Sequence, residues 1–523
     1  GPGAVVAVGG DVDFTNGNFQ AGGGTFTFDG ATSQQLTSNS QSLGNAAITG
    51  TGTVVELQDA ATVTDLVIGT GAELSVAIAS IAVSGDADFS AGTYTAGSGT
   101  LRLDGTAAQA VNTGGFANDL GTVVVEGGSR TVTLGADTRT GDLSISDGGA
   151  NTPILATGAH SLDVNGDLQV TDSLDASGQT AGETTTVSGT LTVDGPGGSM
   201  KAGAGALTVD GVTTVDGSLT LGEGEATFET TVAGGGTVTG ASGGTAGAID
   251  INGDVTFTGS FTASADDTSV AGEFTAPTAF AANGGTMIFD GTDGSEVGGY
   301  TFWNVTVRAD TEMAGDWTVG GALLVDDGAG GTTATLTTED HSLDVSGALT
   351  VTDEIDAGNQ SSAASFDVDG SATVNGLLTL GEGDAALAGD LAGSGTFTGA
   401  TGASAGAIDI DGDVSFTGAF AASGTTTRIG GAFTAPDSAA FAANGGLIVF
   451  DTTDGAQIGG YDFADVRTTA DKSMVGDWTA DSLDITAGAL TTGDNSLDIA
   501  GDVSVDGSLV AAAQLAADPT SVG

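Results

Sequence analysis

Internal repetition is the sequence feature that most constrains how this chain can fold. The segment GSLTLGEGE, which starts at Gly217, returns as GLLTLGEGD at Gly376. The segment AGAIDINGDVTFTG at Ala246 returns as AGAIDIDGDVSFTG at Ala405, and both pairs lie 159 positions apart. Copies this similar predict one supersecondary unit stacked many times, because stacked repeats bury a continuous core between neighbours.

The spacing between copies changes by 22 residues part-way along the chain. HSLDV at His160 and at His341 lie 181 positions apart, but by Gly222 and Gly381 the offset has fallen to 159. The earlier copy therefore carries an insertion around GPGGSMKAGAGALTVDG. Three strands of ~4–5 residues with short connections need roughly 20 residues. A solenoid can gain one turn of this size, whereas a β-sandwich that lost it would expose a core edge.

The local pattern predicts short strands throughout the chain. SLDVSGALTVTDEIDAG, from Ser342, alternates apolar and polar residues, as half-buried strands do. Asn-Gly, Asp-Gly and Ser-Gly pairs separate such runs and suit tight corners. We predict an all-β fold, a parallel β-helix (β-solenoid) rod, with a string of β-sandwich domains as the alternative. The one candidate helix is LVAAAQLAAD from Leu509, as a C-terminal cap.

The repeats divide the sequence into four blocks and a tail. GDVDFTNGNFQAGGGTFTFDG at Gly10 and GDADFSAGTYTAGSGTLRLDG at Gly85 match without a gap. We place the first block at 1–84, the second, with the extra turn, at 85–215, and the third at 216–374. The fourth block spans 375–512, and 513–523 form a C-terminal tail.

The residue pattern of GTLTVDG, GDLQVTDSLDASG and GALTVTDEIDAG resembles the β-helical repeat regions of prokaryotic surface proteins. Filamentous haemagglutinin-like and autotransporter-passenger-like adhesins are the families it is similar to. The resemblance implies a right-handed parallel β-helix displayed outside the cell. It carries over no functional residue.

The charge balance excludes several partners. The chain has 67 acidic and 8 basic residues and a formal net charge of -59. Nucleic acid and anionic membranes require Lys and Arg, so neither is an expected partner. No segment approaches the ~20 apolar residues of a membrane span. Cysteine is absent, which excludes thiolate metal sites. A carboxylate-rich surface of this kind resembles the proteins of extreme halophiles and predicts stabilisation by salt.

Two acidic motifs are candidate calcium sites. DIDGD contains Asp409, Asp411 and Asp413, and DINGD contains Asp250 and Asp254. Both open like a calcium-binding loop, but neither is completed by a Glu at the required distance. A β-turn corner is the alternative interpretation of both motifs. Calcium is therefore a possible ligand, and no other cofactor is expected.

Catalytic residues are not indicated. His160 and His341 occupy the same repeat position, and Asn495 replaces them in the last copy. A catalytic base is seldom duplicated and then replaced, so we interpret these positions as structural corners. The eight basic residues are scattered, and carboxylate pairs are too abundant here to indicate a glycosidase. We predict that the protein is not an enzyme.

Aromatic residues recur in register and predict internal stacks. Tyr300 matches Tyr461, and Trp317 matches Trp478. Trp303 has no aromatic counterpart and is the residue to inspect for exposure. The sequons at Asn304 and Asn359 are weak glycosylation signals in a Thr-rich chain.

These observations predict an extracellular or cell-surface structural protein of a prokaryote. It would act as a fibre subunit, a surface-layer component or a rigid spacer. The N-terminal AVVAVGG, from Ala4, reads as an uncapped strand, so we expect end-to-end association of identical copies or contact with neighbouring surface proteins. A carbohydrate- or cell-binding adhesin, with glycans as partners, is the alternative. A β-helical polysaccharide lyase or hydrolase is a third.

Overall fold

The computed structural model is an all-β protein. It describes residues 3–20, 22–149, 151–275, 277–291, 294–328, 333–434, 440–511 and 521–522. Their 69 strands contain two to five residues each, and no α-helix occurs among them. The strand pairs are parallel and form a β-solenoid of about 25 turns, which confirms the expected β-helical repeat fold. No helix long and apolar enough to cross a membrane is found in the described part of the chain.

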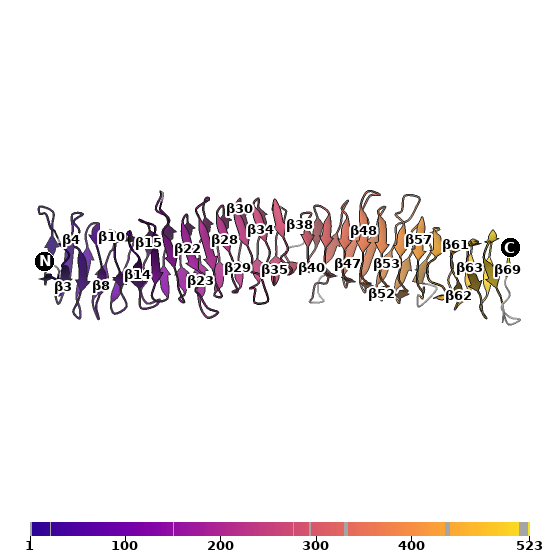
Figure 1. The fold of residues 1–523 in the computed structure, drawn as a ribbon, viewed down its shortest axis with the longest axis horizontal. Coiled ribbons are helices and arrows are strands. Elements are labelled where there is room, and N and C mark those ends of the chain that lie inside the picture. The colour runs from indigo at the N-terminus through magenta and orange to yellow at the C-terminus, as the bar shows by residue number, and fades with distance from the viewer. Residues whose placement is uncertain are drawn as a thin grey trace. The chain divides into compact units, whose positions relative to one another are not determined.

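The chain forms two compact units. Unit 1 comprises Gly1–Ser269 and Ala276–Asn283, and unit 2 comprises Val270–Thr275 and Gly284–Gly523. Within each unit, successive turns place their strands side by side (Figure 1).

A turn in unit 1 consists of three strands, one in each of three parallel sheets. One such turn contains β17 (Thr138–Thr140), β18 (Leu143–Ile145) and β19 (Ile154–Ala156). The next contains β20 (Leu162–Val164), β21 (Leu168–Val170) and β22 (Ser173–Ala176). Each strand pairs with its counterpart one turn later: β17 with β20, β18 with β21, and β19 with β22.

The core is a set of apolar columns that run from turn to turn. Ile145, Val170, Val193 and Val215 occupy one column and are each 0% exposed. Burying such a side chain stabilises the fold by about 1.5–3 kcal/mol. Alternate positions face outward because successive strand side chains point to opposite faces of a sheet.

The 22 inserted residues form one turn of unit 1. The turn before them contains β23 (Thr184–Val187) and β24 (Leu191–Val193), and the inserted segment supplies β25 (Ser199–Ala202), β26 (Ala206–Val209) and β27 (Thr213–Val215). Strand β25 pairs with β22 and with β28 (Ser218–Thr220). Strands β26 and β27 pair with β23 and β24 in the other two sheets.

Unit 2 lacks this turn at the equivalent place. Its β46 (Leu349–Val351), β47 (Glu354–Ala357), β48 (Ser365–Val368) and β49 (Ala372–Val374) follow the spacing of β21 to β24. Strand β50 (Leu377–Leu380), which matches β28, comes directly next.

Glycine at the corners allows the turns to approach each other closely. A Cβ on Gly376 would lie 1.8 Å from the carbonyl oxygen of Asp353 in the preceding turn. A Cβ on Gly211 would lie 2.4 Å from the carbonyl oxygen of Gly189. Any larger residue would therefore force neighbouring turns apart.

The candidate helix at Leu509 begins instead as a strand. Leu509 lies in β68 (Ser508–Val510), which pairs with β65 (Ala489–Thr491). The preceding turn extends the sheet up to Val510, so backbone pairing determines the conformation of Leu509 and Val510. The rest of the segment, 512–520, lies outside the described residues.

Candidate functional site: corner carboxylates and a polar groove

The five calcium candidates are divided between strands and the corners that follow them. Asp250 lies in β32 (Ile249–Ile251) and Asp409 in β54 (Ile408–Ile410). Asp254, Asp411 and Asp413 belong to the turns that follow these strands. Among the described residues, the only group of at least three acidic or histidine ligands within 4.8 Å of one another is elsewhere. The structure does not bring these five carboxylates together as one site.

Asp413 and Asp409 show how these aspartates interact within the chain. Asp413 Oδ1 accepts a hydrogen bond from the backbone N–H of Ala432, at 2.8 Å, one turn later. Asp409 Oδ2 lies 3.8 Å from Arg428 Nε. Burial raises the pKa of Asp409, and the Arg428 guanidinium opposes that rise. Both carboxylates therefore link adjacent turns.

The same arrangement recurs along both units. Asp142 accepts a bond from the N–H of Asp167, at 3.1 Å, and Asp167 accepts one from Thr190, at 2.8 Å. In unit 2, Asp390 accepts one from Asp413 at 2.8 Å. We call these side chains corner carboxylates. A hydrogen bond to an ionised acceptor contributes more than a neutral one, so each carboxylate stabilises the contact between two turns.

Sequence reasoning missed the corner carboxylates, although a signal was present. The dipeptide Gly-Asp recurs after strands at intervals close to one turn, at 141–142 and 166–167 in unit 1 and at 389–390 and 412–413 in unit 2. Once the turn length is known, this spacing stacks each aspartate beside the next.

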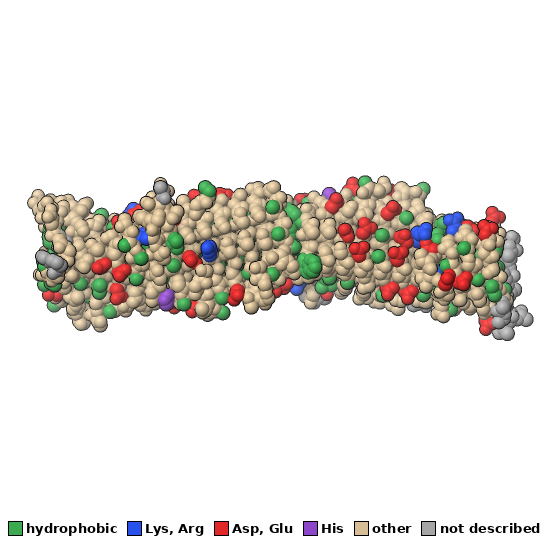
Figure 2. All heavy atoms as spheres, in the orientation of Figure 1, with side chains coloured by type: hydrophobic (Ala, Val, Ile, Leu, Met, Phe, Trp, Pro, Cys, Tyr) green, Lys and Arg blue, Asp and Glu red, His purple; other side chains and the backbone are tan. Residues whose placement is uncertain are grey.

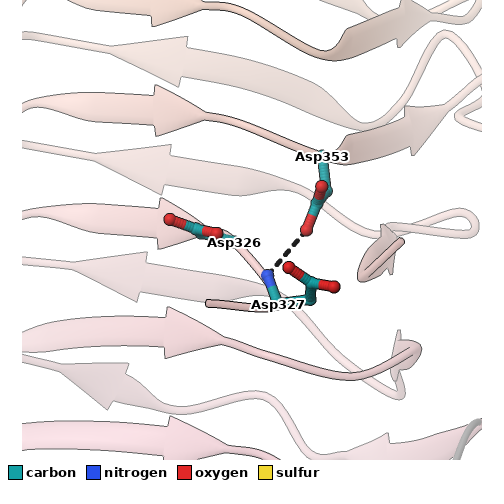
Figure 3. Close-up of side chains that lie close together, drawn as sticks. All are labelled: Asp326, Asp327 and Asp353. Carbon is teal, nitrogen blue, oxygen red and sulfur yellow. Dashed lines mark hydrogen bonds between the residues drawn. The ribbon is translucent and has the colours of Figure 1, made fainter. Parts of the chain in front are cut away.

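Three carboxylates do converge, in unit 2 (Figure 3). Asp326 and Asp327 follow β43 (Leu323–Val325), Asp353 follows β46, and one oxygen of each lies within 4.8 Å of the others. Asp353 Oδ2 accepts the N–H of Asp327, at 2.6 Å, and the N–H of Ala334, at 3.3 Å. Calcium takes six to eight oxygens, so this group would supply only part of a coordination shell.

At the equivalent corner of unit 1 the hydrogen bond from a backbone N–H to an aspartate is present, but only two of the three aspartates are. Asp172 Oδ2 accepts the N–H of Asp147 at 2.9 Å, and Ser146 stands where unit 2 has Asp326. Asp172 is 7% exposed, and burial raises its pKa. The feature common to both copies is the hydrogen bond between turns, which indicates a structural role.

The duplicated histidines also lie at corners. His160 Nδ1 is 4.0 Å from Asp137 Oδ1, and His341 Nδ1 is 3.8 Å from Asp316 Oδ1. The carbonyl oxygen of His341 accepts a bond from Gln360 Nε2, at 2.7 Å. In the third copy, Asn495 Nδ2 donates to the carbonyl oxygen of Met474 at 2.8 Å.

Most of the repeated aromatics pack inside the solenoid, as the register predicts, whereas Phe14, Phe19 and Tyr300 are half-buried. Trp317 and Trp478 are each 1% exposed. Tyr94 stacks on Phe89 with ring centroids 5.1 Å apart, and the earlier copy stacks Phe14 on Phe19 at 5.0 Å. Trp303 differs from these, since it is 51% exposed.

A polar groove crosses four consecutive turns of unit 1. Its volume is about 620 Å³. It begins at β12 (Thr93–Thr95), passes Ala117 and Asp119, and reaches Asp142 and Asn165. Turns lie ~4.8 Å apart, so four of them give the groove a length of about 14 Å.

Beside this groove, the side chain of Asn118 makes hydrogen bonds to the backbone that a strand would otherwise make. Its Oδ1 accepts the N–H of Tyr94 at 2.9 Å, and its Nδ2 donates to the carbonyl oxygens of Phe89 and Thr113 at 3.1 and 2.8 Å. Next to Asn118, the chain pairs with the following turn through an isolated bridge, Asp119 to Arg139, and not through a strand. The sheet is interrupted, and the surface is hollowed there.

No protein-family model, curated protein or solved structure matches this chain. The assignment of function therefore depends on the fold and on these two features.

Proposed function

We propose that this chain is an extracellular structural protein of a prokaryotic cell, acting as a fibre subunit, a surface-layer component or a rigid spacer. The observation that carries the proposal is the continuous parallel ladder within each unit, reinforced at its corners by carboxylates. Such stacking extends a protein in one direction, because each added turn contributes a similar free energy through contacts with its neighbours.

The charge distribution supports an exposed role. Figure 2 shows many more acidic than basic side chains on the visible face, in keeping with the net charge of -59. Carboxylates keep a surface hydrated, and their repulsion disfavours sideways packing of identical copies. The resemblance to surface-adhesin repeat regions is consistent with this location.

A non-catalytic role accounts for most of the basic residues. Arg102, Arg139, Arg428 and Arg467 pair with carboxylates. Lys472 is 1% exposed and donates to the carbonyl oxygens of Asp451 and Thr453 at 2.8 and 2.7 Å. Each of these cations serves a structural contact.

We further propose that copies associate end to end. Strand β1 (Val5–Val8) pairs with β3 (Thr25–Phe28), and its Val5 and Val6 are 64% and 46% exposed. Among the described residues β1 is the edge strand of its sheet, and the backbone groups of an edge strand can pair with a strand from a second copy.

Microscopy and light scattering test the proposal together. Negative-stain images of the purified protein should show narrow particles that lengthen with concentration, and immunogold labelling should place the protein outside the cell. A strictly monomeric species at high concentration and high salt would eliminate end-to-end association. Labelling confined to the cell interior would refute the structural role outside the cell.

A carbohydrate-binding adhesin is the second candidate function. The polar groove favours it, because a concave surface with several hydrogen-bonding side chains is the form that binding sites commonly take.

A further inference from the structure

An irregular segment of unit 1 contributes to the polar groove. This segment, TGGFAND, supplies Ala117 and Asp119 to the groove lining, and its Gly114 and Gly115 adopt φ values of +74° and +104°. Those left-handed conformations turn the chain outward and place Phe116 at the surface, where it is 37% exposed. The Arg139 guanidinium lies 5.2 Å from the centre of its ring.

The groove presents hydrogen-bond donors and acceptors together. Asp119 and Asp142 supply acceptor oxygens, Asn165 supplies an amide, and Thr93 and Thr95 supply hydroxyls. Each carboxylate already accepts one backbone N–H: Asp119 from Gly121 at 2.8 Å, and Asp142 from Asp167 at 3.1 Å. Asn165 Nδ2 reaches Asp119 Oδ2 at 3.4 Å.

The floor of the groove is bare backbone. Gly97, Gly121, Gly141 and Gly166 stand at the corner of successive turns and line the groove. A ligand can therefore lie against the main chain and reach side chains from four turns at once. No Lys or Arg contributes to the lining, so the groove does not suit a phosphate or another anion.

We propose that this groove binds a neutral oligosaccharide that lies along the stacking direction of unit 1. Sugar hydroxyls both donate and accept, so they match the mixed lining of Asp119, Asp142 and Asn165. An oligosaccharide can place one sugar ring opposite each turn, because the spacing of successive rings along the sugar chain is similar to the spacing of successive turns. This inference rests on the second candidate function.

A basic peptide is the competing ligand class, because two of the lining residues are acidic. Salt distinguishes the two classes. Attraction between a peptide cation and a carboxylate weakens as the Debye length falls from ~10 Å at 0.1 M to ~3 Å at 1 M. Binding of a neutral sugar through hydrogen bonds changes little over that range.

The test uses the full chain and three variants. Ala117→Trp fills the groove from an exposed lining position, and Asn165→Ala removes an amide that lines it. Ala110→Trp is the matched control, because Ala110 is exposed on β14 (Gln109–Asn112), outside the groove. Thermal melts of all variants verify that they fold.

The probes are cellotetraose, maltotetraose, mannotetraose, chitotetraose and a tetralysine peptide, titrated by calorimetry at 0.1 M and 1 M NaCl. We expect at least one sugar to bind the native chain with similar affinity at both salt concentrations. Ala117→Trp should weaken that binding at least tenfold and Asn165→Ala several-fold, while Ala110→Trp leaves it unchanged.

Three results would overturn the assignment. Binding of none of the sugars would remove both the groove proposal and the adhesin role. Equal binding by Ala117→Trp would leave the adhesin role standing and move the site elsewhere. Salt-sensitive binding of tetralysine alone would show that the groove is a cation site. None of these results changes the particles seen by electron microscopy, so the structural role is tested separately.

Discussion

Replacing corner carboxylates tests whether they hold the turns together or only coat the surface. We consider one variant that changes four of them to alanine and a matched variant that changes the same four to asparagine. Two are in unit 1 and two in unit 2: Asp142, Asp167, Asp390 and Asp413. Asparagine keeps the acceptor oxygen and removes the charge, whereas alanine removes both.

The structure gives the magnitude. Each side chain accepts one backbone N–H across a turn, at 2.8–3.1 Å. Because these sites are exposed, each bond is worth about 1 kcal/mol, as for a helix cap. Two lost bonds cost each unit about 2 kcal/mol. With an unfolding entropy of ~2.1 cal/mol/K per residue, a unit of roughly half the chain should melt about 3–4 °C lower.

Calorimetry in ~0.1 M NaCl measures the effect. The alanine variant should melt about 3–4 °C below the native chain. The asparagine variant should melt above the alanine variant, because it keeps the four acceptors and removes four negative charges from a surface with large self-repulsion. If the two variants melt alike and below the native chain, charge rather than bonding between turns explains the aspartates, and the argument fails.

Three further outcomes are expected. The melting midpoint of the native chain, measured by scanning calorimetry, should rise between ~0.1 M and ~2 M NaCl because salt screens the repulsion between carboxylates. An unchanged or lower midpoint would contradict the halophilic interpretation. Deleting Val193–Thr214 should leave a soluble, cooperatively melting protein, because one turn is removed and the turns on either side pair with each other. Aggregation of this variant would show that the segment cannot be removed as a single turn. Burial lowers the pKa of Lys472 in the folded chain below the ordinary lysine value of 10.5. Between the two pKa values the unfolded chain binds more protons than the folded chain. The unfolding free energy of the native chain, relative to Lys472→Met, should therefore increase from neutral pH towards pH 10, and denaturant titrations showing a decrease would refute the burial argument.

The fold was predictable because repetition and period-two alternation point to the same architecture. The offset between copies is 181 at the HSLDV segments and 159 by Gly222 and Gly381, and the missing 22 residues match strands β25, β26 and β27. Buried aromatics were also predictable, since Trp317 and Trp478 share a register. Each of these inferences needs only neighbours in sequence or an offset between copies.

The candidate site was less accessible to sequence reasoning. The DIDGD motif suggested calcium because its acids are close in sequence, but in the structure Asp413 bonds to Ala432, 19 residues away. The convergence of Asp353 with Asp326 depends on the length of the intervening turn. The groove depends on Asn118 replacing strand pairing with side-chain bonds. None of these relations follows from residue type or local spacing.

The additional turn in unit 1 has a consequence for how such proteins can diversify. Its three strands enter three existing sheets and leave the pairing on either side intact. An in-frame duplication or loss of one turn therefore changes the reach of the unit by one strand spacing, ~4.8 Å, without a new fold. The length of such a protein can therefore change in discrete heritable steps, each one turn long.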